Sequence, residues 1–417
     1  MWTKTLLNNY LEENKERNKR GIFTKNHVLS VSGDFGIVNQ IELLGRSFAG
    51  KSVLDYHVVR TGNIVYTKSP LKEYPYGIVK VNRGVDGIVS TLYAVYKVKE
   101  TANGKFVEYY FGLPNRTNRY FKPIVRIGAK HDMKIGNDEV LANYVVFPCV
   151  DEQKRISDFI CLLDERIATQ IKIIEDLKKL KSAISKHLFS QKPNEWNRLD
   201  SLFSKGKAGG TPTSTNKDYY NGDIPFLSIN DITKQGKYIR YTENHLSQSG
   251  LDNSSAWIVP AHSLIMSMYA SVGLVTINEV PIATSQAMFA MQLKDKGLLD
   301  YLYYYLSYFK YRHIHKYLET GTQSNINADI VRSIMIPDYG HGRNIEIAST
   351  LQSIDAKINN ELSVLEQFNK QKNYLLVPDV YMNIWARRYC FCIVSKDNLR
   401  CSLMICSSYD RSIFATK

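Results

Sequence analysis

Two long stretches of this chain carry the same helical pattern of apolar residues, and this repetition constrains the fold more than any other feature. In residues 156–188, apolar side chains recur at steps of three or four residues or their sums, and neither Gly nor Pro interrupts them. A narrow apolar stripe of this kind predicts a continuous helix that pairs with another helix. About 33 helical residues would form a rod of about 50 Å, because each residue adds about 1.5 Å.

The second stretch, residues 347–375, is predicted to be the partner of the first. A shift of 191 positions places Asp164 on Asp355 and Lys181 on Lys372, so charged residues match as well as apolar ones. Two unrelated amphipathic helices are the alternative. The side chains predicted to pair the helices or to dock partner proteins are Ile160, Leu163, Ile167, Ile174 and Leu177 in the first stretch and Leu351, Ile354, Ile358, Leu362 and Leu365 in the second.

The chain that precedes each long helix repeats as well. Three pairs of segments correspond in the same order: residues 29–31 with 227–229, residues 87–90 with 282–285, and residues 145–148 with 334–337. Each globular unit spans about 150 residues, the size of one domain. Segments rich in β-branched and aromatic residues predict strands. Residues 301–318 predict a Tyr-rich helix, whose rings either pack in the core or stack on bases.

The predicted fold class is therefore α+β: two mixed α/β domains alternate with two long helices, which pair as an antiparallel coiled coil in a pseudo-twofold arrangement. The predicted boundaries are a first domain at 1–150, a long helix at 151–191, a second domain at 192–341, a second long helix at 342–376 and an atypical tail at 377–417. The tail has four cysteines and no heptad pattern. It is either a frameshifted or read-through end, or a small strand pair added to the helices.

The net charge of +14 indicates a polyanionic partner, and its distribution is uneven. Residues 1–150 carry 22 basic and 13 acidic residues, whereas residues 193–342 carry 13 of each. If both halves bind DNA, the second must use a local patch instead of bulk charge.

Several motifs of the second half carry a resemblance when they are taken together in order. They are Glu195-Trp196, the run from Gly209 to Thr213, the run from Ile224 to Ile232, Ser285-Gln286-Ala287, the run from Gly321 to Ile326 and, in the first long helix, the run from Leu163 to Ile167. Over residues 1–376 the chain resembles the specificity-subunit family of type I restriction–modification systems. In that family two target-recognition domains alternate with two long helices.

The resemblance implies a non-catalytic subunit that reads a bipartite DNA target. Each globular unit would read one half-site, and the helices would set the spacing between the half-sites. Two modification (methyltransferase) subunits would dock in pseudo-twofold fashion, and restriction/translocase subunits would join them. No cofactor is expected on this chain, because S-adenosylmethionine, ATP and Mg would belong to the partner subunits. A coiled-coil scaffold that does not read DNA is the alternative.

Side chains that can hydrogen-bond base edges or phosphates are the candidates for DNA binding. Asn and Gln suit adenine, Arg and Lys suit guanine, and lysines also bind phosphates. The candidates are Asn39, Gln40, Lys68, Arg83, Arg116 and Arg119 in the first unit and Lys205, Lys207, Thr211, Lys217, Asn230, Gln286, Gln323 and Asn325 in the second.

The chain carries no Gly-x-Ser-x-Gly, His-Glu-x-x-His or Walker pattern, and its cysteine spacings fit no zinc site. An enzyme is therefore not expected, nor is a metal site. No run of eighteen apolar residues occurs, so we expect no membrane span and a cytoplasmic location with free thiols.

Overall fold

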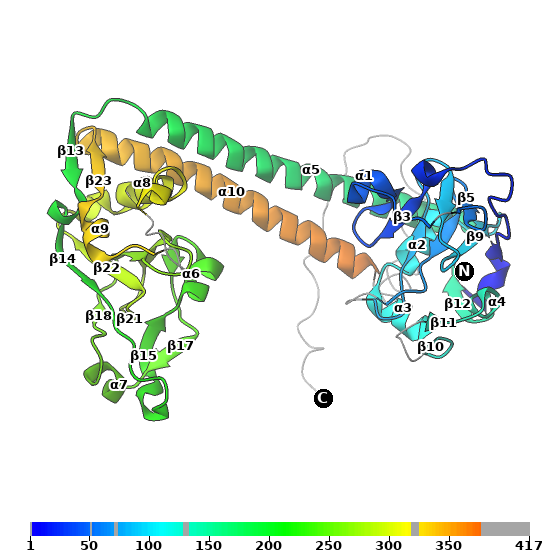
Figure 1. Ribbon diagram of the computed structural model, residues 1–417, viewed down its shortest axis with the longest axis horizontal. Coiled ribbons are helices and arrows are strands. Elements are labelled where there is room, and N and C mark those ends of the chain that lie inside the picture. Colours follow the sequence, from blue (N-terminus) through cyan, green and yellow to red (C-terminus); the bar gives the residue numbers. More distant parts are fainter. Residues whose placement is uncertain (1, 51, 71–73, 128–132, 318–324, 377–417) are drawn as a thin grey trace, which may run out of the picture. The chain divides into compact units, whose positions relative to one another are not determined.

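The computed structural model describes residues 2–50, 52–70, 74–127, 133–317 and 325–376 (Figure 1). They form two compact units of α+β structure. Unit 1 contains residues up to Ala168 together with the end of the last helix from Glu366, and unit 2 contains Thr169–Leu365. The tail at 377–417 and Gln323 lie outside the described residues.

Unit 1 is built on a four-stranded antiparallel sheet. Its strands lie in the order β2 (Leu11–Glu13), β9 (Ala94–Val98), β6 (Ile64–Tyr66) and β7 (Val79–Val81). Four strand pairs accompany it: β1 (Thr3–Leu6) with β12 (Tyr144–Phe147), β3 (Leu29–Ser32) with β4 (Gly36–Asn39), β5 (His57–Val59) with β8 (Gly87–Val89), and β10 (Arg126–Ile127) with β11 (Met133–Lys134). Its short helices are α1 (Gln40–Leu44), α2 (Gly104–Tyr110), α3 (Pro114–Phe121) and α4 (Asn137–Leu141).

Unit 2 contains a larger version of the same arrangement. A five-stranded sheet has the order β14 (Phe203–Ala208), β22 (Met288–Leu293), β19 (Leu264–Ser267), β20 (Val275–Asn278) and β16 (Tyr238–Ile239). A four-stranded sheet has the order β17 (Asn244–Leu246), β15 (Tyr220–Leu227), β21 (Ile282–Thr284) and β18 (Ile258–Val259). Strand β13 (Glu195–Arg198) pairs with β23 (Met335–Asp338), and the helices are α6 (Ile229–Gln235), α7 (Gln248–Asp252), α8 (Leu299–Arg312) and α9 (Ala328–Ser333).

The strand orders show that the two units are copies of one plan. The order β2-β9-β6-β7 of unit 1 recurs in unit 2 as β14-β22-β19-β20. The pairs β1–β12 and β5–β8 recur as β13–β23 and β18–β21, also antiparallel. The registers agree too: Ile64 lies opposite Tyr96 as Leu264 lies opposite Met291. The predicted repeat of the globular units is confirmed.

The long helices are longer than the apolar stripes that predicted them. Helix α5 spans Val150–Phe189 and α10 spans His341–Leu376, 40 and 36 residues respectively. They run antiparallel (Figure 1), and the contacts agree, because the later residue of α5, Lys181, contacts the earlier residue of α10, Asp355. In unit 1 Asp164 contacts Lys372, and in unit 2 Lys181 contacts Asp355.

Burial follows the predicted stripe with one exception. Within the stripe Ile160, Leu163 and Ile174 of α5 and Leu351 and Ile358 of α10 are buried, while Ile167, Leu177, Ile354 and Leu365 are half-buried. Leu362 differs, because its side chain is 41% exposed. Glu361 occupies the facing position instead, where its backbone carbonyl accepts a hydrogen bond from Gln170 Nε2 at 3.0 Å.

The Tyr-rich segment forms helix α8, which ends at Arg312, earlier than the predicted end at residue 318. Tyr301, Tyr304 and Tyr305 are buried in the core of unit 2. These rings therefore belong to the core, as the first of the two interpretations held. Among the described residues, no helix is long and apolar enough to cross a membrane.

Candidate nucleic-acid interface

The Gly209-Gly210-Thr211 motif of unit 2 is a loop that packs directly on the end of β21. Gly210 N–H donates to Thr284 O at 2.9 Å. A Cβ atom on Gly209 would lie 1.9 Å from Thr284 O, and one on Gly210 would lie 2.2 Å from Ser255 Oγ. Only glycine permits so close an approach of two backbones. The result is that Thr211, which follows, hydrogen-bonds the exposed Gln286 side chain.

Gln286 itself lies in a tight turn between β21 and β22. Ala287 N–H donates to Ser285 Oγ at 3.3 Å, and Met288 N–H donates to Ser285 O at 3.1 Å. These two bonds fix the turn and leave Gln286 at its tip. An exposed amide on a rigid turn has the donor and the acceptor that base-edge recognition requires.

The loop between β19 and β20 adjoins this turn. Met268 N–H donates to Ala287 O at 2.7 Å, and Ile326 N–H donates to Met268 O at 3.1 Å. Ala270 and Ser271 have φ angles of 36° and 53°, a conformation that non-glycine residues rarely adopt. Strained backbone of this kind is concentrated at functional sites.

We call these exposed or half-buried side chains the unit 2 edge. Its members are Thr211, Tyr269, Gln286 and Asn325. Three of the four were predicted from the sequence, and Tyr269 was not. The signal that could have found Tyr269 is its place in a hairpin loop between two fully buried strands.

The remaining described candidates of unit 2 lie on other elements of the unit. Lys205 and Lys207 are exposed on β14, and Lys205 Nζ lies 4.3 Å from the centroid of the Trp257 ring. Lys217 is exposed in a short 3-10 segment. Asn230 lies in the first turn of α6 and donates to Glu243 Oε2 at 2.9 Å.

Unit 1 repeats the turn with a different residue at its tip. Leu92 N–H donates to Ser90 Oγ at 3.3 Å, and Tyr93 N–H donates to Ser90 O at 3.0 Å, the same two bonds as in unit 2. Thr91 therefore occupies the position of Gln286, and it is exposed. Nothing in the sequence points directly to Thr91, since the correspondence of residues 87–90 with 282–285 ends just before it.

His57 lies behind this turn and is buried, with 2% of its surface exposed. Its Nδ1 has no hydrogen-bond partner among the described residues. Burial, followed by the positive charge of Arg17, lowers the pKa of His57 to about 4, while a hydrogen bond with the Thr91 backbone acts in the opposite direction. The imidazole is thus neutral at pH 7. Trp257 occupies the same register position in unit 2, and its Nε1 is likewise buried without a partner.

Three predicted DNA-binding residues of unit 1 hold its own loops. Asn39 caps α1 by accepting from Ile41 N–H at 2.9 Å, and Gln40 accepts from Phe48 N–H at 2.7 Å. Lys68 donates to Ile135 O at 3.0 Å, and burial lowers the pKa of its amine. Within the described part of the chain, none of these three side chains makes a hydrogen bond to the Thr91 turn.

The arginines of unit 1 lie elsewhere. Arg83 pairs with Glu108 at 2.9 Å and lies over the Tyr109 ring. Arg116 and Arg119 line a cleft beside the β1–β12 strand pair.

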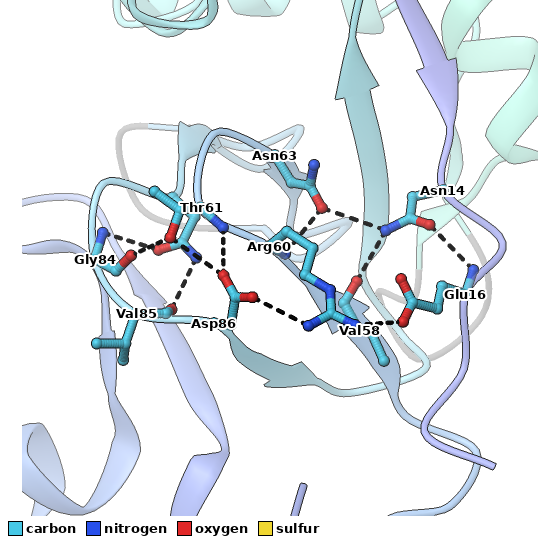
Figure 2. Close-up of polar contacts among 10 residues, drawn as sticks. Asn14, Glu16, Val58, Arg60, Thr61, Asn63, Gly84, Val85 and Asp86 are labelled. Carbon is cyan, nitrogen blue, oxygen red and sulfur yellow. Dashed lines mark hydrogen bonds and ion pairs between the residues drawn. The ribbon is translucent and has the colours of Figure 1, made fainter. Parts of the chain in front are cut away.

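A polar network stiffens unit 1 behind its sheet (Figure 2). The Arg60 guanidinium contacts Glu16 at 2.7 Å and Asp86 at 3.1 Å, and Asp86 also accepts from Thr61 N–H at 2.7 Å. The Thr61 backbone bond and the Arg60 side chain lower the pKa of the Asp86 carboxyl. The network joins the β5–β6 turn to the loop before β8.

The helix pair carries one three-residue contact that is built twice. In unit 1 Asp164 accepts from Tyr109 OH at 2.9 Å and pairs with Lys372 at 2.5 Å. In unit 2 Asp355 accepts from Tyr304 OH at 2.8 Å and pairs with Lys181 at 2.5 Å.

The numbering of these contacts follows the sequence repeat. The 191-residue shift converts the Asp164–Lys372 contact into Asp355–Lys181, with the helices exchanged. It also places Gln170 on Glu361, and these two residues contact each other. Reciprocal contacts of this kind are the pattern of a self-complementary, twofold interface.

Comparison with known proteins agrees with this plan. Residues 193–367 match the model of the type I restriction modification DNA specificity domain. The second half of the chain is therefore similar to a type I restriction modification DNA specificity domain. Among curated relatives, the chain is 33% identical over 113 residues to the HindI specificity subunit of Haemophilus influenzae, covering 27% of this chain and 24% of that protein. It is 27% identical over 158 residues to the MjaIX specificity subunit of Methanocaldococcus jannaschii, covering 37% of this chain and 36% of that protein.

The matched segments therefore span about a quarter to a third of these curated relatives. Solved structures extend the likeness of the fold to most of the chain. A chain from a type I restriction–modification system, solved in a study of complex assembly and conformational transition, has a TM-score of 0.58 at 15% identity, covering 90% of this chain and 96% of that chain. The specificity subunit from M. genitalium has a TM-score of 0.54 at 13% identity, covering 90% of this chain and 95% of that chain.

Among the described residues, no three His, Cys, Asp or Glu side chains are grouped so that they could hold a metal ion.

Proposed function

We propose that this chain selects the DNA target of a type I restriction–modification complex, with each unit reading one half of a bipartite site. The observation that carries the proposal is the internal repeat: one strand order, one turn geometry and one helix contact each occur twice. Two copies of one reader on paired helices suit a target with two half-sites.

In this proposal the Ser90–Leu92 turn of unit 1 and the unit 2 edge face the bases. The exposed lysines of β14 contact phosphates in unit 2, and the positive surplus of residues 1–150 attracts DNA to unit 1. The paired helices fix the spacing between the half-sites. Two modification subunits dock on the chain and restriction/translocase subunits join them, so that S-adenosylmethionine, ATP and Mg are bound by partners. The complex acts in the cytoplasm, where its DNA substrate lies.

A domain exchange tests the assignment of recognition to unit 1. Residues 1–150 are replaced by the corresponding segment of another family member, and methylated adenines are mapped across the host genome. We expect one half of the methylated motif to change and the other half to stay. A motif that is unchanged in both halves contradicts the proposal.

A coiled-coil scaffold without DNA readout predicts a different result in a binding titration. If the assembled complex contacts phosphates, its affinity for the target duplex falls steeply and log-linearly with salt concentration, because counterions are released. A scaffold would show no affinity for the duplex at any salt concentration.

A further inference from the structure

Each unit is tied to its long helix at a first point, close to where that helix begins. Gln153 in the first turn of α5 is buried, accepts a hydrogen bond from Asn103 N–H at 2.9 Å and donates to Pro148 O at 2.9 Å. The 191-residue shift places Gln153 on Asn344 of α10, which is also buried and donates to Asp338 Oδ1 at 2.8 Å. Apolar packing beside this point is not directional, so it fixes the angle between unit and helix less sharply than a hydrogen bond would.

A second polar contact lies 11 residues further along each helix, a distance of about 16 Å. There the buried Tyr109 of α2 donates to Asp164 at 2.9 Å, and the buried Tyr304 of α8 donates to Asp355 at 2.8 Å. Burial, and then the negative charge of the aspartate, raises the pKa of both phenols, so both hydroxyls stay protonated and remain donors. Two attachment points on one rod define an angle as well as a position.

A cation lies against each of these tyrosines, and the two units supply it from different places. Lys237, just before β16, lies 4.4 Å from the centroid of the Tyr304 ring and donates to its hydroxyl at 3.3 Å. In unit 1 the Arg83 guanidinium, which follows β7, lies 5.6 Å from the centroid of the Tyr109 ring. Each cation also pairs with a carboxylate of the helix that carries the tyrosine. Both units therefore brace the tyrosine with a cation, although the two cations do not correspond in the strand order.

We propose that the Tyr109 and Tyr304 hydroxyls are positioning groups: they fix the angle of each unit on its long helix and so set how strictly the complex selects the spacing between the half-sites. One added base pair moves a half-site by about 3.4 Å and turns it by about 35° around the duplex axis. A unit held at a fixed angle accepts one such position, whereas a unit that can pivot accepts the neighbouring positions as well. The inference rests on the proposed function, which supplies the two half-sites.

The test measures methylation by the complex of the full chain with modification subunits. The substrates are duplexes that carry both half-sites of the wild-type motif, found by methylation mapping, with the spacer shortened or lengthened by one or two base pairs. Tyr109→Phe and Tyr304→Phe keep the ring and remove the hydroxyl. We expect each variant to lower the preference for the wild-type spacer over its neighbours at least about threefold, and the double variant to lower it further. Base preference within each half-site should stay within about twofold of the wild type.

Tyrosines that bond inside their own unit provide matched controls. The buried Tyr120 and Tyr305 hydroxyls donate to backbone carbonyls at 2.5 Å and 3.0 Å, and neither carbonyl belongs to α5 or α10. Tyr120→Phe and Tyr305→Phe should therefore leave the spacer preference unchanged, while thermal unfolding shows whether they cost as much stability as the test variants. If Tyr304→Phe is unfolded at the assay temperature, Asp355→Asn removes the charge at the same contact and should change the spacer preference in the same direction.

Three other outcomes are decisive. If the test variants keep the spacer preference of the wild type, or if the controls lose it equally, the positioning proposal is overturned while the proposed function stands. If base preference falls together with spacer preference, the hydroxyls act on base reading itself, and the positioning proposal is again overturned. If the wild-type complex methylates no bipartite motif, the proposed function itself fails.

Discussion

In both units, the backbone carbonyl of an asparagine holds the loop that follows β5 in unit 1 and β18 in unit 2. The side chains at neighbouring positions differ between the two units. Asn82 O accepts from Gly62 N–H at 2.7 Å, and Asn278 O accepts from His262 N–H at 2.7 Å. The positive φ of Gly62, 88°, is reproduced by His262 at 62°. The backbone plan is therefore kept even where the favoured residue, glycine, is lost.

The side chains at the positions next to these loops differ chemically between the two units. Arg60 and Asp86 form an ion pair in unit 1, whereas the register places Pro260 and Pro281 at these positions in unit 2. Charge and proline are two ways to stiffen a loop, and only one of them responds to pH. The comparison teaches that the scaffold of the repeat is fixed by backbone contacts, while side chains at its rim are free to diverge.

The largest expected effect comes from the glycine loop of unit 2. Gly209→Ala forces a Cβ atom against Thr284 O, and we expect unit 2 to lose about 3 kcal/mol of stability. Gly342→Ala is the matched control, since nothing lies within 4 Å of its added Cβ. Both are measured by chemical denaturation followed through hydrogen exchange in unit 2. A loss below about 1 kcal/mol for Gly209→Ala would show that the loop can shift.

The duplicated helix contact tests whether the two halves of the repeat contribute equally to stability, as their matching geometry suggests. Asp355→Ala and Asp164→Ala each remove a carboxylate that holds a lysine and a tyrosine hydroxyl. We expect each to cost about 2 kcal/mol, since hydrogen bonds to charged groups are worth more than neutral ones. Denaturation of the two variants should give equal costs. Values that differ by more than about 1 kcal/mol would break the equivalence of the two halves.

Acid should distinguish the units at the position shared by His57 and Trp257. The pKa of His57 is lowered in the folded state, so the unfolded chain binds more protons and stability falls as pH drops from about 6.5 toward about 4. We expect about 2 kcal/mol of acid-dependent loss in unit 1 between pH 7 and pH 4.5. His57→Phe should remove it. Hydrogen exchange of β5 and β8 at pH 7 and pH 4.5 measures the effect, with β18 and β21 as the internal reference.

The two turn tips test whether readout follows the repeat. Gln286→Thr and Thr91→Gln exchange the residues that sit on identical turns. If these tips read bases, each change should alter preference at one base pair of one half-site by about 1–2 kcal/mol, the range for one base contact. Methylation of a library of randomised targets measures the preference. A uniform loss across all sequences would instead indicate phosphate contact.

Much of this fold could be predicted from the sequence. The phase of the apolar stripe and the matches of Asp164 with Asp355 and of Lys181 with Lys372 predicted the helix pair, and in the structure these charges contact each other across the two helices. The stripe did not predict the exposure of Leu362, since the neighbouring Glu361 contacts Gln170 through its backbone carbonyl and its carboxylate.

The candidate site was less predictable. Residue type alone selected Asn39 and Gln40, but their amides cap a helix and hold a loop, which are local contacts that composition cannot distinguish from base recognition. Thr91 went unnoticed because the turn that presents it is defined by the Ser90 side chain and backbone, and its own side chain differs from Gln286. Similar geometry with dissimilar chemistry is what a reader of two different half-sites requires.

The smallest expected effect concerns the ion pair that unit 2 replaces with prolines. Asp86→Asn removes the charge that pairs with Arg60, but both side chains are about 40% exposed, so water screens the pair. The folded-state pKa of Asp86 is lowered, so its contribution is present above the unfolded pKa and is lost as pH falls through the folded value. We expect a loss of about 0.5 kcal/mol at pH 7 that vanishes near pH 2 and shrinks in high salt. Denaturation at both pH values measures it. A loss that persists at pH 2 would mean that the Thr61 backbone bond, and not the charge, fastens this loop.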